Sequence, residues 1–236
     1  MDFSELKSIC GDCTIRELCL PAGLSDEEVM LLDQHMAHRQ VVKKGESLYR
    51  TGDSFKSLFA VSTGFLKTSI LHEDGRAQVT GFQMAGEILG LDAISTDQHI
   101  CDAVALVDSM VCEITFDRFE ELGQLMSNLQ HRFNKTLSRE IVREQGMMLL
   151  LGSMSAEERL AAFLGSLAKR FAARKQSGSE LVLPMTREDI GSYLGLKLET
   201  VSRILSRFHD QQLLEVKGRS VRILDQAGLN QMIGDS

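Results

Sequence analysis

The stretch Thr186–Phe208, TREDIGSYLGLKLETVSRILSRF, predicts two short helices joined by a tight turn. Thr186 followed by Asp189 is typical of a helix N-cap with an acidic first turn, and Gly195 permits the turn. Apolar residues recur at helical spacing in both helices and mark their buried sides, namely Ile190, Leu194, Val201, Ile204, Leu205 and Phe208. This pattern is typical of a helix-turn-helix.

The second of these helices carries side chains suited to reading DNA. Glu199, Ser202 and Arg203 occur at i, i+3 and i+4 and so share one helical face. Arg203 can donate two hydrogen bonds to a guanine, Glu199 can accept one from a cytosine, and Ser202 can serve a base or a phosphate. Thr200 and Arg207 also point away from the predicted core. A solvated surface helix is the alternative, but the cap, the turn and the basic ribbon that follows favour DNA binding.

That ribbon is LLEVKGRSVRIL, which predicts two short strands around Lys217–Gly218. Such a wing would present Lys217 and Arg219 to the phosphate backbone. The formal charge of −7 hides an asymmetry, because residues 1–126 hold 10 Lys and Arg against 21 Asp and Glu. Residues 127–236 hold 16 against 12, so the half that carries the helix-turn-helix is the basic half.

Three of the five cysteines fall at the N-terminus, where Cys10, Cys13 and Cys19 are spaced C-x2-C-x5-C. The short gap lets two thiolates face one metal centre and the longer gap brings in a third, but this spacing alone does not distinguish zinc from an iron–sulfur cluster. A fourth thiolate would come from Cys101 or Cys112. An odd number of cysteines argues against a disulfide framework.

Two ranges carry the patterns of a sensor domain and of an interface between two copies of the chain, residues 39–114 and residues 128–151. The first range holds short runs rich in Val, Ile, Phe and Thr between glycines, which predicts a β-barrel or jelly roll with a hairpin turn at Asp74–Gly75. The second predicts a long helix with an apolar seam for a symmetric partner, formed by Phe133, Leu137, Ile141 and Met148. Glu144 falls in that seam, where it either places like charges close together or reaches water at the seam's edge.

Four segments together resemble the FNR branch of the CRP/FNR transcription factors: LGLKLETVSRILSRF, the cysteine-rich N-terminus, SMVCEITF around Cys112, and AEERLAAFL from Ala156 to Leu164. The resemblance implies an oxygen-labile four-iron four-sulfur cluster that controls dimerisation and DNA binding, and it favours Cys112 as the fourth ligand. It also implies an activator of anaerobic gene expression that contacts RNA polymerase and a palindromic TTGAT-type operator.

The overall prediction is an α+β homodimer with four parts. Residues 1–22 form an iron–sulfur-binding segment, 23–121 a β-roll (jelly-roll) sensor domain, 122–152 a dimerisation helix and 153–236 a winged helix-turn-helix domain. Within these parts, Ser25 is expected to cap a short helix and Ala156–Ala173 to form another helix. No apolar run is long enough to span a bilayer and the N-terminus does not resemble a signal peptide, so we expect a cytoplasmic protein without membrane contact.

Two alternatives remain open at this level. One is a regulator that answers a small molecule in the β-roll, and the other is a regulator with only a structural zinc at the cysteines. A cyclic nucleotide is disfavoured, since residues 85–117 contain no Lys or Arg to pair with its phosphate. No pairing of a nucleophile with a positioned His and no phosphate-binding loop points to an enzyme.

Overall fold

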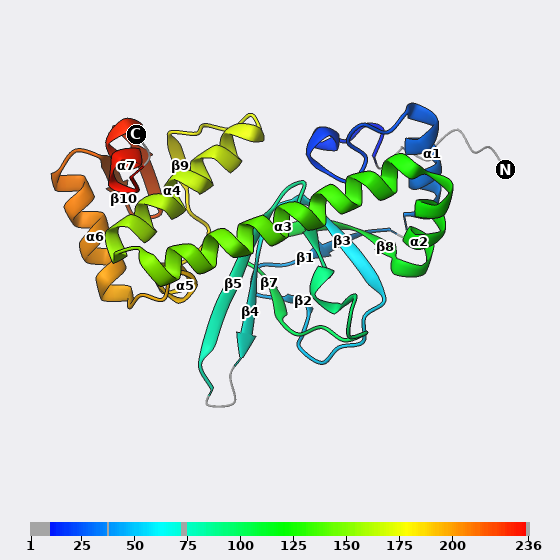
Figure 1. Ribbon diagram of the computed structural model, residues 1–236, viewed down its shortest axis with the longest axis horizontal. Helices are drawn as coiled ribbons and strands as arrows, with labels where there is room; N and C mark the ends of the chain where they lie inside the picture. Colours follow the sequence, from blue (N-terminus) through cyan, green and yellow to red (C-terminus); the bar gives the residue numbers. More distant parts are fainter. Residues whose placement is uncertain (1–9, 37, 72–74, 235–236) are drawn as a thin grey trace. The chain divides into compact units, whose positions relative to one another are not determined.

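The computed structural model describes residues 10–36, 38–71 and 75–234, which divide into two compact units (Figure 1). The first unit combines the described residues of 1–71 with 80–140, and the second combines those of 72–79 with 141–236. Helix α3, Ser127–Ser153, is continuous across the boundary after Glu140. A single helix therefore belongs to both units.

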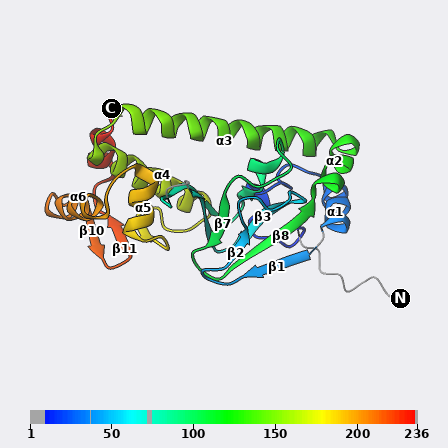
Figure 2. The ribbon, with the colours of Figure 1, turned by 90° about the horizontal axis from the view of Figure 1, so that it is seen from below.

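The first unit is a β-roll of two four-stranded sheets, as predicted. One sheet has the order β1-β8-β3-β6 and the other β2-β7-β4-β5, and β1, β8 and β3 of the first sheet are labelled in Figure 2. The predicted turn at Asp74–Gly75 lies partly outside the described residues. The strands are β1 His38–Val42, β2 Ser47–Tyr49, β3 Ser57–Thr63, β4 Phe65–Leu71, β5 Ala77–Met84, β6 Ile88–Leu89, β7 Asp102–Ala105 and β8 Ser109–Thr115.

Two hydrophobic cores cover the two faces of the β1-β8-β3-β6 sheet. Because successive side chains of a strand point to opposite faces, Val111 enters the core inside the roll while Cys112 and Ile114 enter the core outside it. The outer core also receives helices α1, Asp26–His35, and α2, Phe116–Leu125, and the start of α3. This outer face is where the N-terminal segment packs.

The short helices of the first unit have clear local causes. Ser25 caps α1 in a reciprocal capping box with Glu28, as the sequence predicts for this cap. The cysteine-bearing segment, residues 10–24 before α1, contains the 3₁₀ turn η2, Arg16–Leu18, and another 3₁₀ turn, η3, Leu91–Ala93, follows β6.

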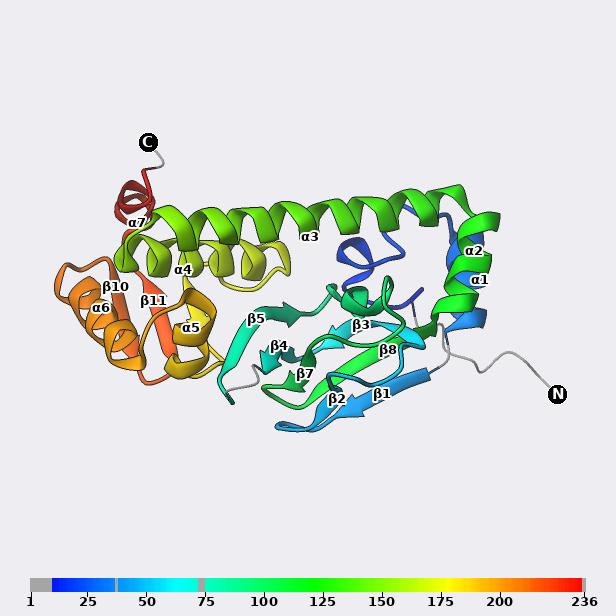
Figure 3. The ribbon, with the colours of Figure 1, turned by 60° about the horizontal axis from the view of Figure 1, so that its bottom comes forward.

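The second unit holds the winged helix-turn-helix (Figure 3). Helix α4 begins at Ala156 after a Ser155–Glu158 capping box and ends at Ala173, the range that the sequence predicts. The other elements are β9 Glu180–Val182, α5 Arg187–Leu194, α6 Leu198–Asp210, β10 Leu214–Lys217, β11 Ser220–Ile223 and α7 Gln226–Met232. Strand β11 lies between β10 and β9 in one antiparallel sheet, so the predicted wing is confirmed.

None of the helices in the described part of the chain combines the length and the apolar character that a membrane span requires.

Candidate functional site

Four of the five cysteines line one cavity on the outer face of the β-roll. Cys10, Cys13 and Cys19 reach it from the segment before α1, and Cys112 reaches it from β8. The cavity has a volume of about 20 Å³, room for about one water molecule. Its other lining residues are mostly apolar and include Ile15, Leu20, Pro21, Leu32 and Met36. The structure therefore brings the four predicted ligands together in an apolar setting.

Three polar contacts hold the cysteine-bearing segment on the first unit. The Cys10 backbone N–H donates to Asp33 Oδ1 of α1 at 2.8 Å. The Arg16 guanidinium binds Asp26 Oδ1 at 3.2 Å. Nε of Arg132, in the first turns of α3, donates to the Cys19 carbonyl oxygen at 3.3 Å. The last contact places the segment directly against the predicted dimerisation helix.

Burial raises the pKa of three thiols that line this cavity, those of Cys10, Cys19 and Cys112. Burial, with a further contribution from Asp33, raises the pKa of Cys10 far above its usual range. Burial raises the pKa of Cys19 to about 12, although part of that residue's surface reaches solvent. Burial also raises the pKa of Cys112, against the opposing influence of Arg39. Metal binding here must therefore displace protons.

The donor set fits an iron–sulfur cluster in its chemistry, since four cysteine thiolates are the usual ligands of a four-iron four-sulfur cluster. Throughout residues 10–36, 38–71 and 75–234, however, no three His, Cys, Asp or Glu side chains are arranged to hold a metal ion. The four cysteines share a small cavity without forming a closed ligand cage. The cavity has room for about one water molecule, so holding a cluster would require the thiols to lie farther apart.

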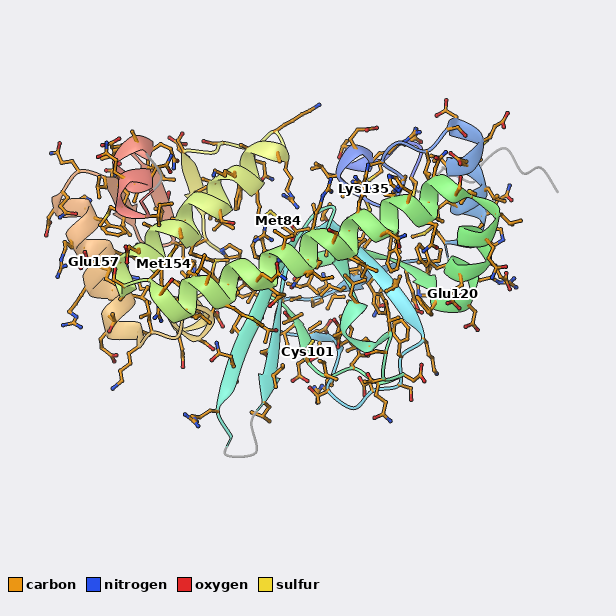
Figure 4. All side chains as sticks on the ribbon, viewed as in Figure 1. Met84, Cys101, Glu120, Lys135, Met154 and Glu157 are labelled. Carbon is orange, nitrogen blue, oxygen red and sulfur yellow. The ribbon has the colours of Figure 1, made fainter. Side chains whose placement is uncertain are left out.

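Cys101 lies in the other core, inside the β-roll (Figure 4). Its thiol donates to Asp92 Oδ2 at 3.5 Å, and His99 Nδ1 lies 3.4 Å from the same oxygen. Tyr49 stacks on the His99 ring with 3.7 Å between centroids. Burial, followed by Asp92, raises the pKa of Cys101 to about 12. Cys101 is thus a packed, protonated thiol apart from the other four.

The helix-turn-helix forms as the sequence predicts. The Thr186 side chain accepts from the Asp189 backbone N–H at 3.0 Å and caps α5. Gly195 ends this helix with φ of 64°, in the left-handed region that glycine tolerates. A Cβ atom on Gly191 would lie 2.6 Å from the Leu196 carbonyl oxygen, so only glycine permits this close approach. The predicted apolar residues of both helices are buried, from Ile190 to Phe208.

The predicted DNA-reading residues occupy the remaining surface of α6. Glu199 and Arg203 are exposed, whereas Thr200 and Ser202 are half-buried. Arg207 forms an ion pair with Glu157 of α4, so it is engaged within the protein rather than directed only outward. In the wing, Lys217 and Arg219 are exposed, and Lys217 Nζ lies 2.6 Å from Glu215 Oε1.

One basic residue was missed by reasoning from the sequence. Arg187, the first residue of α5, donates from Nη1 to Ser202 Oγ at 3.1 Å. It lines a cavity of about 210 Å³ between α5, α6 and the wing, as does Arg219. The sequence signal that could have identified Arg187 is its place directly after the N-cap Thr186. In the fold this place lies next to the reading helix, α6.

The predicted dimer seam divides into a buried and an exposed part. Phe133 is 6% exposed and packs edge-to-face on Phe119, with 4.7 Å between centroids, and Leu137 packs partly on the same core. Phe133 therefore packs within its own unit and leaves little surface for the partner that the sequence predicts. Ile141 and Met148 are 58% and 72% exposed, and Glu144 is exposed between them.

Comparison with known proteins places the chain among transcription regulators. It is 45% identical over 226 residues to the fumarate and nitrate reduction regulatory protein of Yersinia pestis, covering 96% of this chain and 90% of that one. It is 44% identical over 225 residues to the transcriptional activator protein FnrA of Stutzerimonas stutzeri, covering 95% and 92%. The structure of FixK2 from Bradyrhizobium japonicum superposes with a TM-score of 0.76 at 31% identity, covering 83% and 96%.

Residues 158–232 match the family described as the Crp-like helix-turn-helix domain, and residues 39–125 match the cyclic nucleotide-binding domain. With the exposed polar face of α6 and the wing, these matches define a DNA-binding transcription regulator with a β-roll. The chain belongs to the FNR branch of the CRP/FNR family. Proteins of this family are regulators and not enzymes.

Proposed function

We propose that this FNR-type regulator responds to oxygen through a four-iron four-sulfur cluster held by Cys10, Cys13, Cys19 and Cys112. The observation that carries the proposal is the single apolar cavity in which these four cysteines meet, while Cys101 is packed in a different core. The names of the relatives, fumarate and nitrate reduction regulators, point the same way. Such a regulator would act in the cytoplasm, where the DNA is.

When bound, the cluster supplies reactivity toward oxygen, and its surroundings tune that reactivity. The chain's own residues control access to the site. Leu20 and Leu32 are 4% and 1% exposed and shield the cavity from solvent. Asp33 fixes the backbone at Cys10, and Arg132 fixes it at Cys19. These contacts determine where the thiolates are presented.

The same contacts connect the cysteines to α3. A bound group shifts a monomer–dimer equilibrium only if it binds one conformation better than the other. Because Arg132 of α3 donates to the Cys19 carbonyl oxygen, movement of the cysteine-bearing segment changes a contact on that helix. We infer that the position of the segment and the pairing of α3 are coupled through Arg132.

We further propose that the exposed apolar side chains of α3 pair with a second copy of the chain. Four apolar side chains of α3 are each more than half exposed, those of Ile141, Val142, Met148 and Leu149. Met148 follows Ile141 by seven residues, and Leu149 follows Val142 by seven. This repeat is the spacing at which two helices pack along their length. A symmetric dimer presents two copies of α6 to a palindrome of TTGAT-type half-sites, whereas a monomer presents one.

The cofactor is tested by purifying the protein without oxygen and measuring iron, acid-labile sulfide and visible absorbance. We expect both elements in equal amounts and a broad absorbance that disappears in air. Cys112→Ser should lose them and the matched variant Cys101→Ser should keep them. Zinc without visible absorbance would support a structural metal instead, and a metal-free protein would support a small-molecule regulator.

The match to the cyclic nucleotide-binding domain supports a second candidate, a regulator that answers a ligand in the β-roll. A cyclic phosphate would need a cationic partner, and residues 85–117 contain no Lys or Arg. We therefore rank this candidate below the cluster.

A further inference from the structure

Arg159, in the first turn of α4, binds three main-chain carbonyl oxygens at once. Its Nη2 donates to Leu151 at 2.7 Å, its Nε to Met154 at 2.9 Å and its Nη1 to Leu194 at 3.2 Å. The side chain is half-buried. A guanidinium presents five N–H groups in one plane, so it can serve three acceptors in fixed directions.

The three carbonyls belong to three different parts of the second unit. Leu151 lies in the last turn of α3, Met154 in the connection between α3 and α4, and Leu194 at the end of α5. Carbonyls at the C-terminal end of a helix lack intrahelical donors and carry partial negative charge. A cation shared by the ends of α3 and α5 therefore stabilises their juxtaposition.

The turn of the helix-turn-helix lies against these contacts of Arg159 with the ends of α3 and α5, which we call the joint. A Cβ atom added to Gly195 would stand 3.6 Å from Arg159 Nη1 and 3.6 Å from Leu151 Cδ2. The end of α3 and Gly195, the residue that follows α5, therefore both lie in van der Waals reach of this guanidinium. The contact belongs wholly to the second unit, residues 141–236.

Helix α4 ties the reading elements to this joint by two more contacts. The Phe163 ring of α4 meets the Tyr193 ring of α5 with 5.7 Å between centroids. Glu157 of α4, labelled in Figure 4, forms an ion pair with Arg207 of α6. Of these three connections, only that of Arg159 also includes the end of α3.

We propose that Arg159 is a positioning residue that fixes the helix-turn-helix on the end of α3 and so sets the spacing between the two copies of α6. This inference rests on the proposed pairing of α3. A dimer that reads a palindrome must hold its recognition helices at the separation of the half-sites, about one helical turn of DNA. If this joint could move, each α6 could still read its own half-site. The two copies of α6 would then no longer be held at the separation needed to bind both half-sites at once.

The test compares Arg159→Gln and Arg159→Lys with Lys169→Gln, a matched loss of charge at an exposed position on the same helix. Three duplexes are used at one salt concentration: a palindrome of two TTGAT half-sites, the same palindrome lengthened by two base pairs at its centre, and a single half-site. The anaerobic full-length protein is titrated with each duplex, and sedimentation and thermal unfolding are recorded alongside.

We expect Arg159→Gln to weaken binding to the correct palindrome roughly tenfold or more, through loss of effective concentration. Affinity for the single half-site should change less than about twofold, because the side chains of α6 that would read one half-site are unchanged. Preference for the correct over the lengthened palindrome should fall. Arg159→Lys should be intermediate, since an ammonium keeps the charge without the planar fork. Lys169→Gln should match the wild type.

Equal losses on all three duplexes would overturn the inference and make Arg159 a residue that only supports the fold of the domain. Unchanged binding by Arg159→Gln would overturn it as well. A wild-type protein that binds the palindrome no better than the half-site would overturn the proposed dimer, and this inference with it. Sedimentation separates that last outcome from the first two.

Discussion

Replacing Phe133 by Ala should destabilise the first unit rather than the dimer. Phe133 is 6% exposed, packs edge-to-face on Phe119 at 4.7 Å and joins the outer core of the β-roll. Truncating a buried Phe to Ala removes its transfer free energy and leaves a cavity, which together cost about 3–5 kcal/mol. For a chain of this size each kcal/mol lowers the melting temperature by roughly 2–4 °C. The expected shift is therefore about 6–20 °C.

The matched variant is Ile141→Ala, on the same helix. Ile141 is 58% exposed, so its truncation should cost the folded monomer about 1 kcal/mol or less. Urea unfolding of the air-exposed protein, followed by circular dichroism, measures both free energies, and sedimentation of the anaerobic protein measures dimerisation. We expect Phe133→Ala to lose stability and Ile141→Ala to lose dimerisation. Wild-type stability together with failed dimerisation for Phe133→Ala would refute its assignment to the core.

Three other predictions concern the reading surface, the contact between the cysteine-bearing segment and α3, and the buried thiol of Cys101. Arg203→Ala should cost about 1–3 kcal/mol of operator binding and relax selectivity at one guanine, whereas Lys217→Ala should weaken binding to all sequences alike. Competition titrations measure both effects. Equal weakening of all sequences by Arg203→Ala would show that Arg203 contacts only phosphate. Arg132→Gln should retain the iron of the anaerobic protein but raise the dimer dissociation constant, and loss of both in parallel would place Arg132 at the cofactor site instead. Cys101 should resist iodoacetamide at pH 8 in the native protein, because its buried thiol has a pKa of about 12 and stays protonated. Peptide mapping measures the alkylation. Rapid alkylation at Cys101 would contradict its place in the β-roll core.

Local sequence signals predicted the helix-turn-helix and the wing well. Caps such as Thr186 and Ser25, the glycine at 195 and the apolar spacing of α6 act over a few residues, so they can be read directly from the chain. The limits of α4 followed from the same kind of signal.

Contacts between distant residues were beyond that reasoning. The spacing of Phe133, Leu137 and Ile141 is the same whether a helix packs on its own domain or on a partner, so it did not show that Phe133 is in the core. The pair Arg207–Glu157 and the contacts of Arg159 join segments far apart in the sequence. The cysteine spacing alone left Cys101 and Cys112 open as the fourth ligand, since the core that each side chain enters depends on how distant strands pair.

The central claim is that oxygen controls operator binding through the four cysteines that meet on the outer face of the β-roll. Its most direct test is the affinity of anaerobically prepared protein for a duplex with two TTGAT half-sites, measured before and after exposure to air, at constant salt. The account predicts tight binding by a dimer before air and weak binding by a monomer afterwards. Cys112→Ser should bind weakly under both conditions. An air-insensitive dimer with undiminished operator binding would contradict the account.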